Sequence, residues 1–408
     1  MEPLSFSGVV VVGLVAFLVP LVLGFMPWLR LPAVVIEISA GIIIGPAVLG
    51  LVTIDAPIHV FELVGVVFVL FLAGQQVAFA QLRGAPLRVA GLGFTLALVL
   101  ALLAGLGLAA AGLVNSPILI AIALAATALG IILGIIKDAG HGATPFGQVV
   151  IAAGSLGDFG TIILLSLFFS RREAGPLLQV LLITSLAALA CIAILALVRV
   201  GRLPRIAAVL QRLQDTSAQI RVRGALLLLL IFVALAEGLG LEVVLGAFVA
   251  GVVMRLIRRE ADQPHDHFRL KLEGIGYGVF APFFFIASGI RFDLPALLAS
   301  TASLALIPLF LGAMLVIHGL PALLLYRRLL GWRRTLAAGL FQSTSLGLLV
   351  IIAQIGRESG TIAPAVGAAL VAAGLLSVLI FPLGALILLR QSDRTDPAPA
   401  PAEAAGLG

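Results

Sequence analysis

Long apolar stretches, separated by short polar or proline- and glycine-containing segments, follow one another along nearly the whole sequence. Most are about 20 residues long, the length that an α-helix needs to cross the hydrocarbon core of a bilayer. We therefore predict thirteen membrane-spanning helices. Their approximate limits are residues 6–26, 31–50, 58–79, 87–113, 117–137, 146–169, 175–199, 222–239, 242–257, 272–290, 298–326, 335–356 and 363–389.

The composition supports the same class of protein. Hydrophobic residues make up 62% of the 408 residues and charged residues only 11%, whereas soluble domains carry about a quarter of charged residues. The chain is thus predicted to be an all-α membrane protein. Its one cysteine, Cys191, excludes an intramolecular disulfide or a cysteine metal cluster, and we expect no cofactor.

The distribution of positive charge predicts the topology. If the N-terminus lies outside, 21 of the 25 Lys and Arg residues fall in cytoplasmic segments, as the positive-inside rule requires. Because the basic residues lie in short loops, they indicate topology and not a nucleic-acid partner. Residues 1–390 form the predicted membrane domain, and the Pro/Ala-rich residues 391–408 are predicted to be a disordered cytoplasmic tail.

The two halves of the chain resemble each other weakly but in the same order. The segment AATALGII (125–132) matches QSTSLGLL (342–349), which pairs Thr127 with Thr344. We predict two six-helix repeats, 6–169 and 222–389, joined by a linker helix at 175–199. Because the linker is a single helix, the second repeat begins on the opposite side of the membrane from the first and is therefore inverted. Inverted repeats place a substrate site near the membrane midplane, between discontinuous helices.

The fifth and twelfth spans are the candidates for such discontinuous, crossed helices. Thr127 lies in the middle of the fifth, and a polar cluster lies at the matching depth of the twelfth: Gln342, Ser343, Thr344 and Ser345. Such side chains form local hydrogen bonds that compete with the helix, and unwound backbone presents carbonyls and helix ends to an ion. The alternative is that these groups bond within or between regular helices.

One carboxylate stands out within the segment AAGSLGDFGTIILLSLFF (152–169), where Ser155 and Gly157 precede Asp158. An ionisable residue inside a membrane is a functional candidate because desolvating its charge is costly. A buried carboxylate can hold either a proton or a monovalent cation, and that competition is sufficient for antiport. The structural alternative is a protonated Asp158 that bonds to a neighbouring helix.

Three other ionisable residues lie within or near the predicted spans. His318 could pair with Asp158, or it could make an ordinary hydrogen bond between helices. Glu37, in the second span, is a weaker candidate for transport, since it could equally pack or cap within the protein. Arg291, at the outer boundary, is expected to extend its charged end toward water.

Three motifs resemble the monovalent cation:proton antiporter superfamily, in the branch of Kef-type and Nap-type transporters. The segment LPAVVIEISAGIIIGPAVLG (31–50) is similar to its P-x-V-x-x-E-I-x-x-G-x-x-x-G-P signature. LFLAGQQVAF (70–79) resembles its L-F-x-x-G-L-E motif, with Gln75 and Gln76 in place of Leu-Glu. FFFIASGIRFDL (283–294) resembles its F-F-x-x-x-G-x-x-x-D motif.

This resemblance implies an antiporter that exchanges Na⁺ or K⁺ for H⁺ by an elevator-like movement, as a homodimer in a bacterial inner membrane. Asp158 matches the family's ion-binding Asp, Gly157 replaces the Asp, Asn or Gln that usually precedes it, and His318 falls near its basic residue. The resemblance covers the transmembrane part alone. Only 18 residues follow residue 390, so we expect no Kef-type nucleotide-binding domain in this chain.

Two alternatives remain at this point. The segment SLGD (155–158) is similar to the G-x-G-D motif of intramembrane aspartyl proteases, but that chemistry needs two carboxylates, and the sequence offers no second deep Asp. We therefore expect no enzyme. The other alternative is the same fold moving a different solute or acting as a sensor, because Gly157, Gln75, Gln76 and His318 depart from the family pattern.

Overall fold

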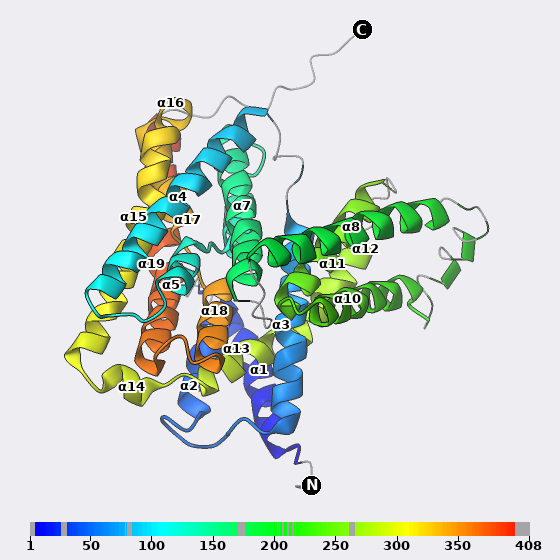
Figure 1. The fold of residues 1–408 in the computed structure, drawn as a ribbon, viewed down its shortest axis with the longest axis horizontal. Coiled ribbons are helices and arrows are strands. Elements are labelled where there is room, and N and C mark those ends of the chain that lie inside the picture. The colour runs from blue at the N-terminus through cyan, green and yellow to red at the C-terminus, as the bar shows by residue number, and fades with distance from the viewer. Residues whose placement is uncertain are drawn as a thin grey trace.

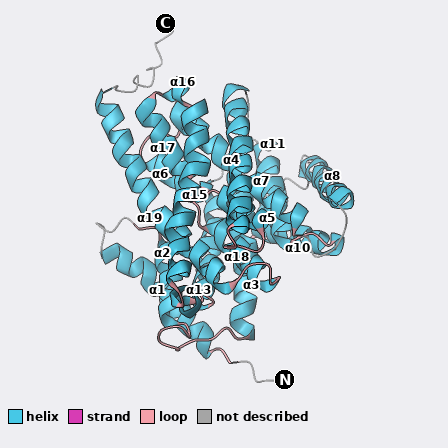
Figure 2. Ribbon diagram, turned by 60° about the vertical axis from the view of Figure 1, so that its left-hand side comes forward, coloured by secondary structure: helices cyan, strands magenta, loops and turns pink. Residues whose placement is uncertain are grey.

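A computed structural model describes residues 5–25, 31–77, 79, 84–169, 176–201, 203, 205, 208–209, 212–213, 216, 218–260 and 266–395. Every regular element in this part of the chain is helical (Figure 2). The first half contains α1 (Ser7–Phe25), α2 (Ala33–Ile44), α3 (Ala56–Gln76), α4 (Gly84–Ala110), α5 (Pro117–Ala125), α6 (Leu129–Asp138), α7 (Pro145–Phe168) and α8 (Pro176–Gly201).

The second half begins with α10 (Ile220–Leu239), α11 (Val243–Glu260), α12 (Asp266–Ile275), the π-helical turn η1 (Gly276–Phe280) and α13 (Ala281–Ile290). It continues with α14 (Leu294–Leu298), α15 (Thr301–Leu325), α16 (Arg327–Leu330), α17 (Trp332–Gln342), α18 (Gly347–Glu358) and α19 (Pro364–Thr395). The π-helical turn precedes Pro282, whose ring nitrogen cannot donate a regular helical hydrogen bond.

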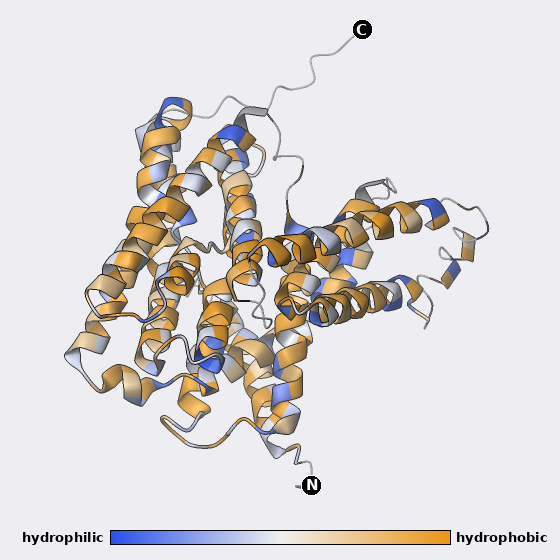
Figure 3. Cartoon of the chain, viewed as in Figure 1, coloured by the Kyte–Doolittle hydropathy of each residue, from blue (hydrophilic) through white to orange (hydrophobic). Residues whose placement is uncertain are grey.

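In the described part of the chain, eleven helical segments are long and apolar enough to cross a membrane, with α5–α6, α12–α13 and α17–α18 each counted as one. Most of their residues are hydrophobic, as the orange colouring of the ribbon in Figure 3 shows. The chain is thus a multi-pass membrane protein. Two further apolar helices, Ala33–Ile44 and Val243–Ile257, are shorter. They lie within the predicted spans 31–50 and 242–257, so each of the thirteen predicted segments contains helix, although two fall short of a full crossing.

Two predicted boundaries were wrong. The helix predicted to reach residue 50 ends at Ile44, because Gly45 is extended (φ −71°, ψ 176°) before Pro46, and a residue before proline disfavours helical geometry. At the other end of the chain, α19 continues to Thr395. Residues 391–395 of the predicted disordered tail are therefore helical, and residues 396–408 lie outside the described part.

The helices pack in two groups (Figure 1). In one, which we call the core bundle, α4, α5, α6, α7, α15, α17, α18 and α19 contact one another. In the other, the scaffold bundle, α1, α2, α3, α8, α10, α11, α12 and α13 do so. The two groups contact each other through α6 and α7, against α3, α8 and α11, and through the short connecting helix α14 against α19.

Glycines allow close contacts between helices of the scaffold bundle. A Cβ atom at Gly74 of α3 would overlap the carbonyl oxygen of Phe248, and one at Gly251 of α11 would overlap the carbonyl oxygen of Phe71. The two glycine Cα atoms thus face each other, and the backbones of α3 and α11 approach as closely as small residues permit in membrane helices. This contact keeps α3 and α11 together as one rigid pair.

We expect Gly251→Leu to separate α3 from α11, at a cost of about 1–3 kcal/mol or more, because the added side chain has no space. The measurement is the melting temperature of the purified protein in detergent. Gly107→Leu in α4 is the matched control, since nothing lies within 4 Å of a Cβ at Gly107. Equal melting temperatures for the two variants would show that this contact is not tight.

Candidate functional site

The helix that begins at Pro117 is interrupted in the middle of the core bundle. α5 ends at Ala125, α6 begins at Leu129, and the intervening Ala126 and Ala128 have non-helical dihedral angles. Thr127 lies in this interruption and is buried. An interruption of this kind creates a helix C-terminus with free carbonyls and a helix N-terminus with free N–H groups, both inside the protein.

Asp158, in α7, faces this interruption and is only 7% exposed. The Thr127 hydroxyl donates a hydrogen bond to Asp158 Oδ1 at 2.7 Å and lies 3.2 Å from the carbonyl oxygen of Gly154. The backbone N–H of Leu129, the first residue of α6, also donates to the Asp158 carboxylate. The carboxylate therefore lies at a helix N-terminus, where the helix dipole favours negative charge.

The two small residues before Asp158 have different surroundings. Ser155 lies one turn earlier in α7 and is fully buried. A Cβ atom at Gly157 would lie 2.8 Å from Thr127 Oγ1 and 2.9 Å from its Cγ2. The Thr127 side chain thus occupies the space that a side chain at position 157 would need, so a second polar side chain before Asp158 is incompatible with this position of Thr127.

His318, in α15, contacts the other side of the interruption. Its Nε2 lies 3.1 Å from the carbonyl oxygen of Leu124, in the last turn of α5. Since a carbonyl only accepts, Nε2 is the donor, and it satisfies one of the carbonyls that the end of α5 leaves free. Of the two roles considered for His318, the described contact is the hydrogen bond between helices; no hydrogen bond to Asp158 occurs among the described residues.

A second helix is interrupted between Gln342, the last residue of α17, and Gly347, the first residue of α18. The Ser343 and Thr344 hydroxyls donate to the carbonyls of Gly339 (2.8 Å) and Leu340 (3.3 Å), four residues earlier. Ser345 is fully buried, and its hydroxyl has no hydrogen-bond partner in the described chain. α17 contacts α7 while α18 contacts α5, so the second interrupted helix packs against the helix that carries Asp158 and the helix that leads into the Thr127 interruption.

A cavity of about 300 Å³ extends from the first turns of α6 into the boundary between the two bundles. Gln75 and Gln76 of α3 line it together with Gly130, Lys137 and Tyr277. Gln76 Nε2 donates to the Tyr277 hydroxyl at 3.0 Å. Gly130 follows Leu129 directly in α6, whereas Asp158 and Thr127 do not line the cavity. Glu37 does not join this site: it is buried in α2, which packs against α1 and α13 in the scaffold bundle.

A buried ion pair was missed in the sequence. Glu62 of α3 is 1% exposed, and Arg291 donates to it from Nε (2.9 Å) and Nη2 (2.9 Å). Arg291 thus binds a buried carboxylate on another helix, while 28% of its own side chain remains exposed; the expectation that its charged end extends toward water stays a prediction. From the core bundle, Gln354 donates to Glu62 Oε1 at 3.2 Å and Arg357 donates to the Arg291 carbonyl at 2.5 Å. The signal available was an acidic residue within the limits of the predicted span 58–79.

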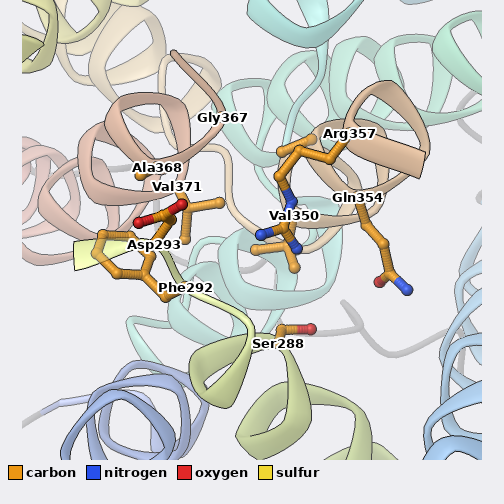
Figure 4. Close-up of a pocket in the computed structure, with 10 residues that line it drawn as sticks. Ser288, Phe292, Asp293, Val350, Gln354, Arg357, Gly367, Ala368 and Val371 are labelled. Atoms are coloured by element: carbon orange, nitrogen blue, oxygen red, sulfur yellow. The ribbon is translucent and has the colours of Figure 1, made fainter. Parts of the chain in front are cut away.

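Figure 4 shows the adjoining pocket, with Gln354 and Arg357 of α18 on one side and Ser288 and Asp293 on the other. Its volume is only about 20 Å³, room for roughly one water molecule. The two bundles are thus in close contact at this end of the molecule and separated by a large cavity at the other.

The chemistry of the candidate site follows from its oxygen atoms. It offers one carboxylate, the Thr127 hydroxyl next to it and interrupted helices at two places nearby. Oxygen atoms of this kind bind hard cations, and unwound helices in transporters coordinate Na⁺ or H⁺. The site can therefore take a proton or a small monovalent cation at Asp158.

Comparison with known proteins gives the family. The family model described as sodium/hydrogen exchanger, transmembrane, matches residues 13–391. A putative Na⁺/H⁺ antiporter of Bacillus subtilis, YjbQ, is 28% identical over 93% of this chain. This chain spans 62% of that relative's length. The probable Na⁺/H⁺ antiporter 3 of Methanocaldococcus jannaschii is 27% identical, over 90% of this chain and 92% of its own.

Two further comparisons concern the cation and the fold. The Na⁺/H⁺-K⁺ antiporter GerN of Bacillus cereus is 26% identical over 64% of this chain and 66% of its own. Among solved structures, the sodium proton antiporter MjNhaP1 of Methanocaldococcus jannaschii at pH 8 has a TM-score of 0.66 and 18% identity. It covers 94% of this chain and 98% of its own. The fold of the two proteins is therefore similar.

We expect Gly157→Ala to destabilise the purified protein, because its Cβ would clash with Thr127, and Thr127→Ala to relieve that clash. Of the three atoms nearest to the added Cβ, all from Thr127, the Cβ of residue 127 at 3.4 Å would then remain. Melting temperatures of both single variants and the double variant give the coupling, about 0.5–3 kcal/mol in favour of the double variant. Gly134→Ala, with nothing within 4 Å of its Cβ, is the control partner for Thr127→Ala. Additive effects for Gly157→Ala would contradict the clash.

Proposed function

This chain belongs to the sodium/hydrogen exchanger family, and we propose that it is a secondary antiporter that exchanges a monovalent cation, Na⁺ or K⁺, for H⁺. The observation that carries the proposal is the buried Asp158 carboxylate, bound by Thr127 and by the first N–H of α6 at an interrupted helix. Relatives named as Na⁺/H⁺ antiporters support Na⁺, and one named as a Na⁺/H⁺-K⁺ antiporter keeps K⁺ as a candidate.

In this proposal Asp158 is the shared binding site. A carboxylate removed from water needs a counter-charge, and either a proton or a monovalent cation supplies it. When a cation arrives, with oxygen ligands from Thr127 and the interrupted backbone, the proton leaves, and the reverse occurs on the other side of the membrane. The empty carboxylate is the costly state, so the site crosses the membrane only when it is occupied.

We further propose that residues 6–169 and 222–389 are inverted repeats joined by the helix at 175–199, and that they form one domain, 1–390. The interruptions at 126–128 and 343–346 support this proposal, since they occur at the positions that the repeat aligns. The charge distribution in the sequence supports an N-terminus outside and a cytoplasmic C-terminus, in the inner membrane of a bacterial-type cell.

Alternating access would then be a movement of the core bundle along the scaffold bundle. Under this orientation the 300 Å³ cavity beside Lys137 faces the cytoplasm, and the polar contacts of Gln354 and Arg357 with the scaffold bundle close the outer side. The arrangement corresponds to an inward-facing state. Reaching the outward-facing state requires that these contacts break. We assign to the scaffold bundle, with exposed apolar residues on α1 and α10, the contact with a second copy in a homodimer.

We predict that Asp158→Asn abolishes exchange, because the amide cannot trade a proton for a cation. The measurement is dequenching of a pH-sensitive dye in everted membrane vesicles after addition of Na⁺, K⁺ or Li⁺. Asp138→Asn, at an exposed carboxylate at the end of α6, is the matched control and should keep the wild-type signal. Wild-type vesicles that respond to none of the three cations would rule out the proposed function.

We also predict electroneutral exchange. One carboxylate that holds either one proton or one monovalent cation carries the same charge in both directions, and Thr127 leaves no space for a second carboxylate at position 157. His318 donates to a neutral carbonyl, so we expect His318→Gln to retain some activity. The test is Na⁺-driven exchange in proteoliposomes with a membrane potential imposed by valinomycin. K⁺ exchange without valinomycin is the control. A rate that follows the voltage would contradict one-for-one exchange.

A further inference from the structure

The second interruption leaves backbone groups that cannot all be paired within its own helix. Between α17 and α18 the regular hydrogen bonds stop, and Ser343, Thr344 and Ser345 are all fully buried. Buried backbone N–H and C=O groups must be paired. The N–H groups of Ser343 and Thr344 still find partners within α17, at the carbonyls of Gly339 (3.0 Å) and Phe341 (3.1 Å). Ser345 lies beyond the reach of that helix end.

A single hydroxyl on α19 contacts both backbone groups of Ser345. Ser377 Oγ accepts from the N–H of Ser345 at 3.1 Å. Its one proton is shared between the carbonyl oxygens of Ser345, at 3.0 Å, and of Gly374, one turn earlier in α19, at 2.7 Å. Ser377 is fully buried, so no water competes for these bonds.

Gly374 makes the close approach possible. A Cβ atom at this position would lie 3.0 Å from the carbonyl oxygen of Ser345 and 3.3 Å from Cδ1 of Leu346. Gly374 and Ser377 thus form a cradle, one turn of α19 long, that receives the backbone of Ser345. Two independent features, an absent side chain and a doubly bonded hydroxyl, point to the same peptide segment.

The cradle leaves the Ser345 side chain without a partner. Its hydroxyl is buried and has no hydrogen-bond partner among the described residues, although its backbone N–H and carbonyl both contact Ser377 of α19. A buried hydroxyl without a partner is costly, unless an ion or water binds it during the cycle. The position of this hydroxyl depends on where α19 holds the Ser345 backbone.

We infer that Ser377, with Gly374, is a positioning residue of the cation site: it holds the interrupted segment 343–346 in the geometry that binds the ion. This inference rests on the proposed exchange function and adds a residue that does not itself touch the ion. It assigns to α19 the role that His318 of α15 has at the end of α5, where a side chain of a neighbouring helix bonds the exposed backbone.

The test compares Ser377→Ala with Ser185→Ala. The Ser185 hydroxyl bonds only the carbonyl of Leu182 in its own helix, α8, so its loss leaves no backbone N–H unpaired. We expect Ser377→Ala to raise deuterium uptake at residues 343–346 and the KM for Na⁺ about fivefold or more. The ratio of the KM values for Li⁺ and Na⁺ should change as well, because a loosened site fits ions of different radius differently. Ser185→Ala should change none of these.

A second variant guards against misfolding. Gly374→Ala keeps the Ser377 hydroxyl but places a Cβ too close to the Ser345 carbonyl oxygen, so it should also change the ratio of the KM values for Li⁺ and Na⁺. Gly312→Ala is the control and should leave that ratio unchanged, since nothing lies within 4 Å of its Cβ. Unchanged deuterium uptake in Ser377→Ala, or raised uptake with wild-type KM values for both ions, would overturn the inference. The inference would also be overturned if exchange of Na⁺ and of Li⁺ fell by the same factor and that factor matched the fall in the amount of folded protein. A wild-type protein that exchanges neither ion would overturn the exchange function instead, and the uptake would still decide whether Ser377 anchors the segment.

Discussion

Interrupting a helix inside a membrane leaves backbone N–H and C=O groups that have neither helical partners nor water. In this protein, neighbouring helices supply the replacements. His318 donates to the end of α5, and the Asp158 carboxylate accepts from the start of α6. Ser377 accepts from the N–H of Ser345 and shares its proton between the carbonyls of Ser345 and Gly374. The candidate site is therefore a consequence of this requirement: the groups that repair the two interruptions also determine where oxygen ligands and the carboxylate lie.

Neighbouring helices can pair these backbone groups only where they pack closely, and glycines, which have no side chain, allow that packing. Gly157 allows Thr127 to approach α7 and donate to Asp158, and Gly374 allows the Ser345 carbonyl to approach α19. In the scaffold bundle, Gly74 and Gly251 bring α3 and α11 together in the same way. Small residues are thus used for two purposes, rigidity in one bundle and access to the backbone in the other.

Hydropathy alone located the helices, since burial in lipid depends on the composition of each segment and not on its partners. The candidate residues Asp158, Thr127 and His318 could also be identified from the sequence, because few polar residues occur within its long apolar segments. Their partners were not. The bonds of His318 to Leu124 and of Arg291 to Glu62 join residues 194 and 229 positions apart, and no local pattern indicates which of several carbonyls or carboxylates a side chain will reach.

The two ends of the boundary between the bundles differ in a way that relates packing to movement. At one end, Gln354 and Arg357 reach across from the core bundle to Glu62 and the Arg291 carbonyl, in contacts that depend on hydrogen bonds. At the other, the bundles are separated by a cavity. Hydrogen bonds that involve a charged group each contribute about 1.5–3 kcal/mol, and the boundary also contains apolar packing, such as Phe159 of α7 stacked on Phe248 of α11. Movement of the core bundle requires that these polar contacts break, whereas the close glycine contact between α3 and α11 lies within one bundle and is not crossed by such a movement. This contrast favours the movement of one bundle as a unit against the other.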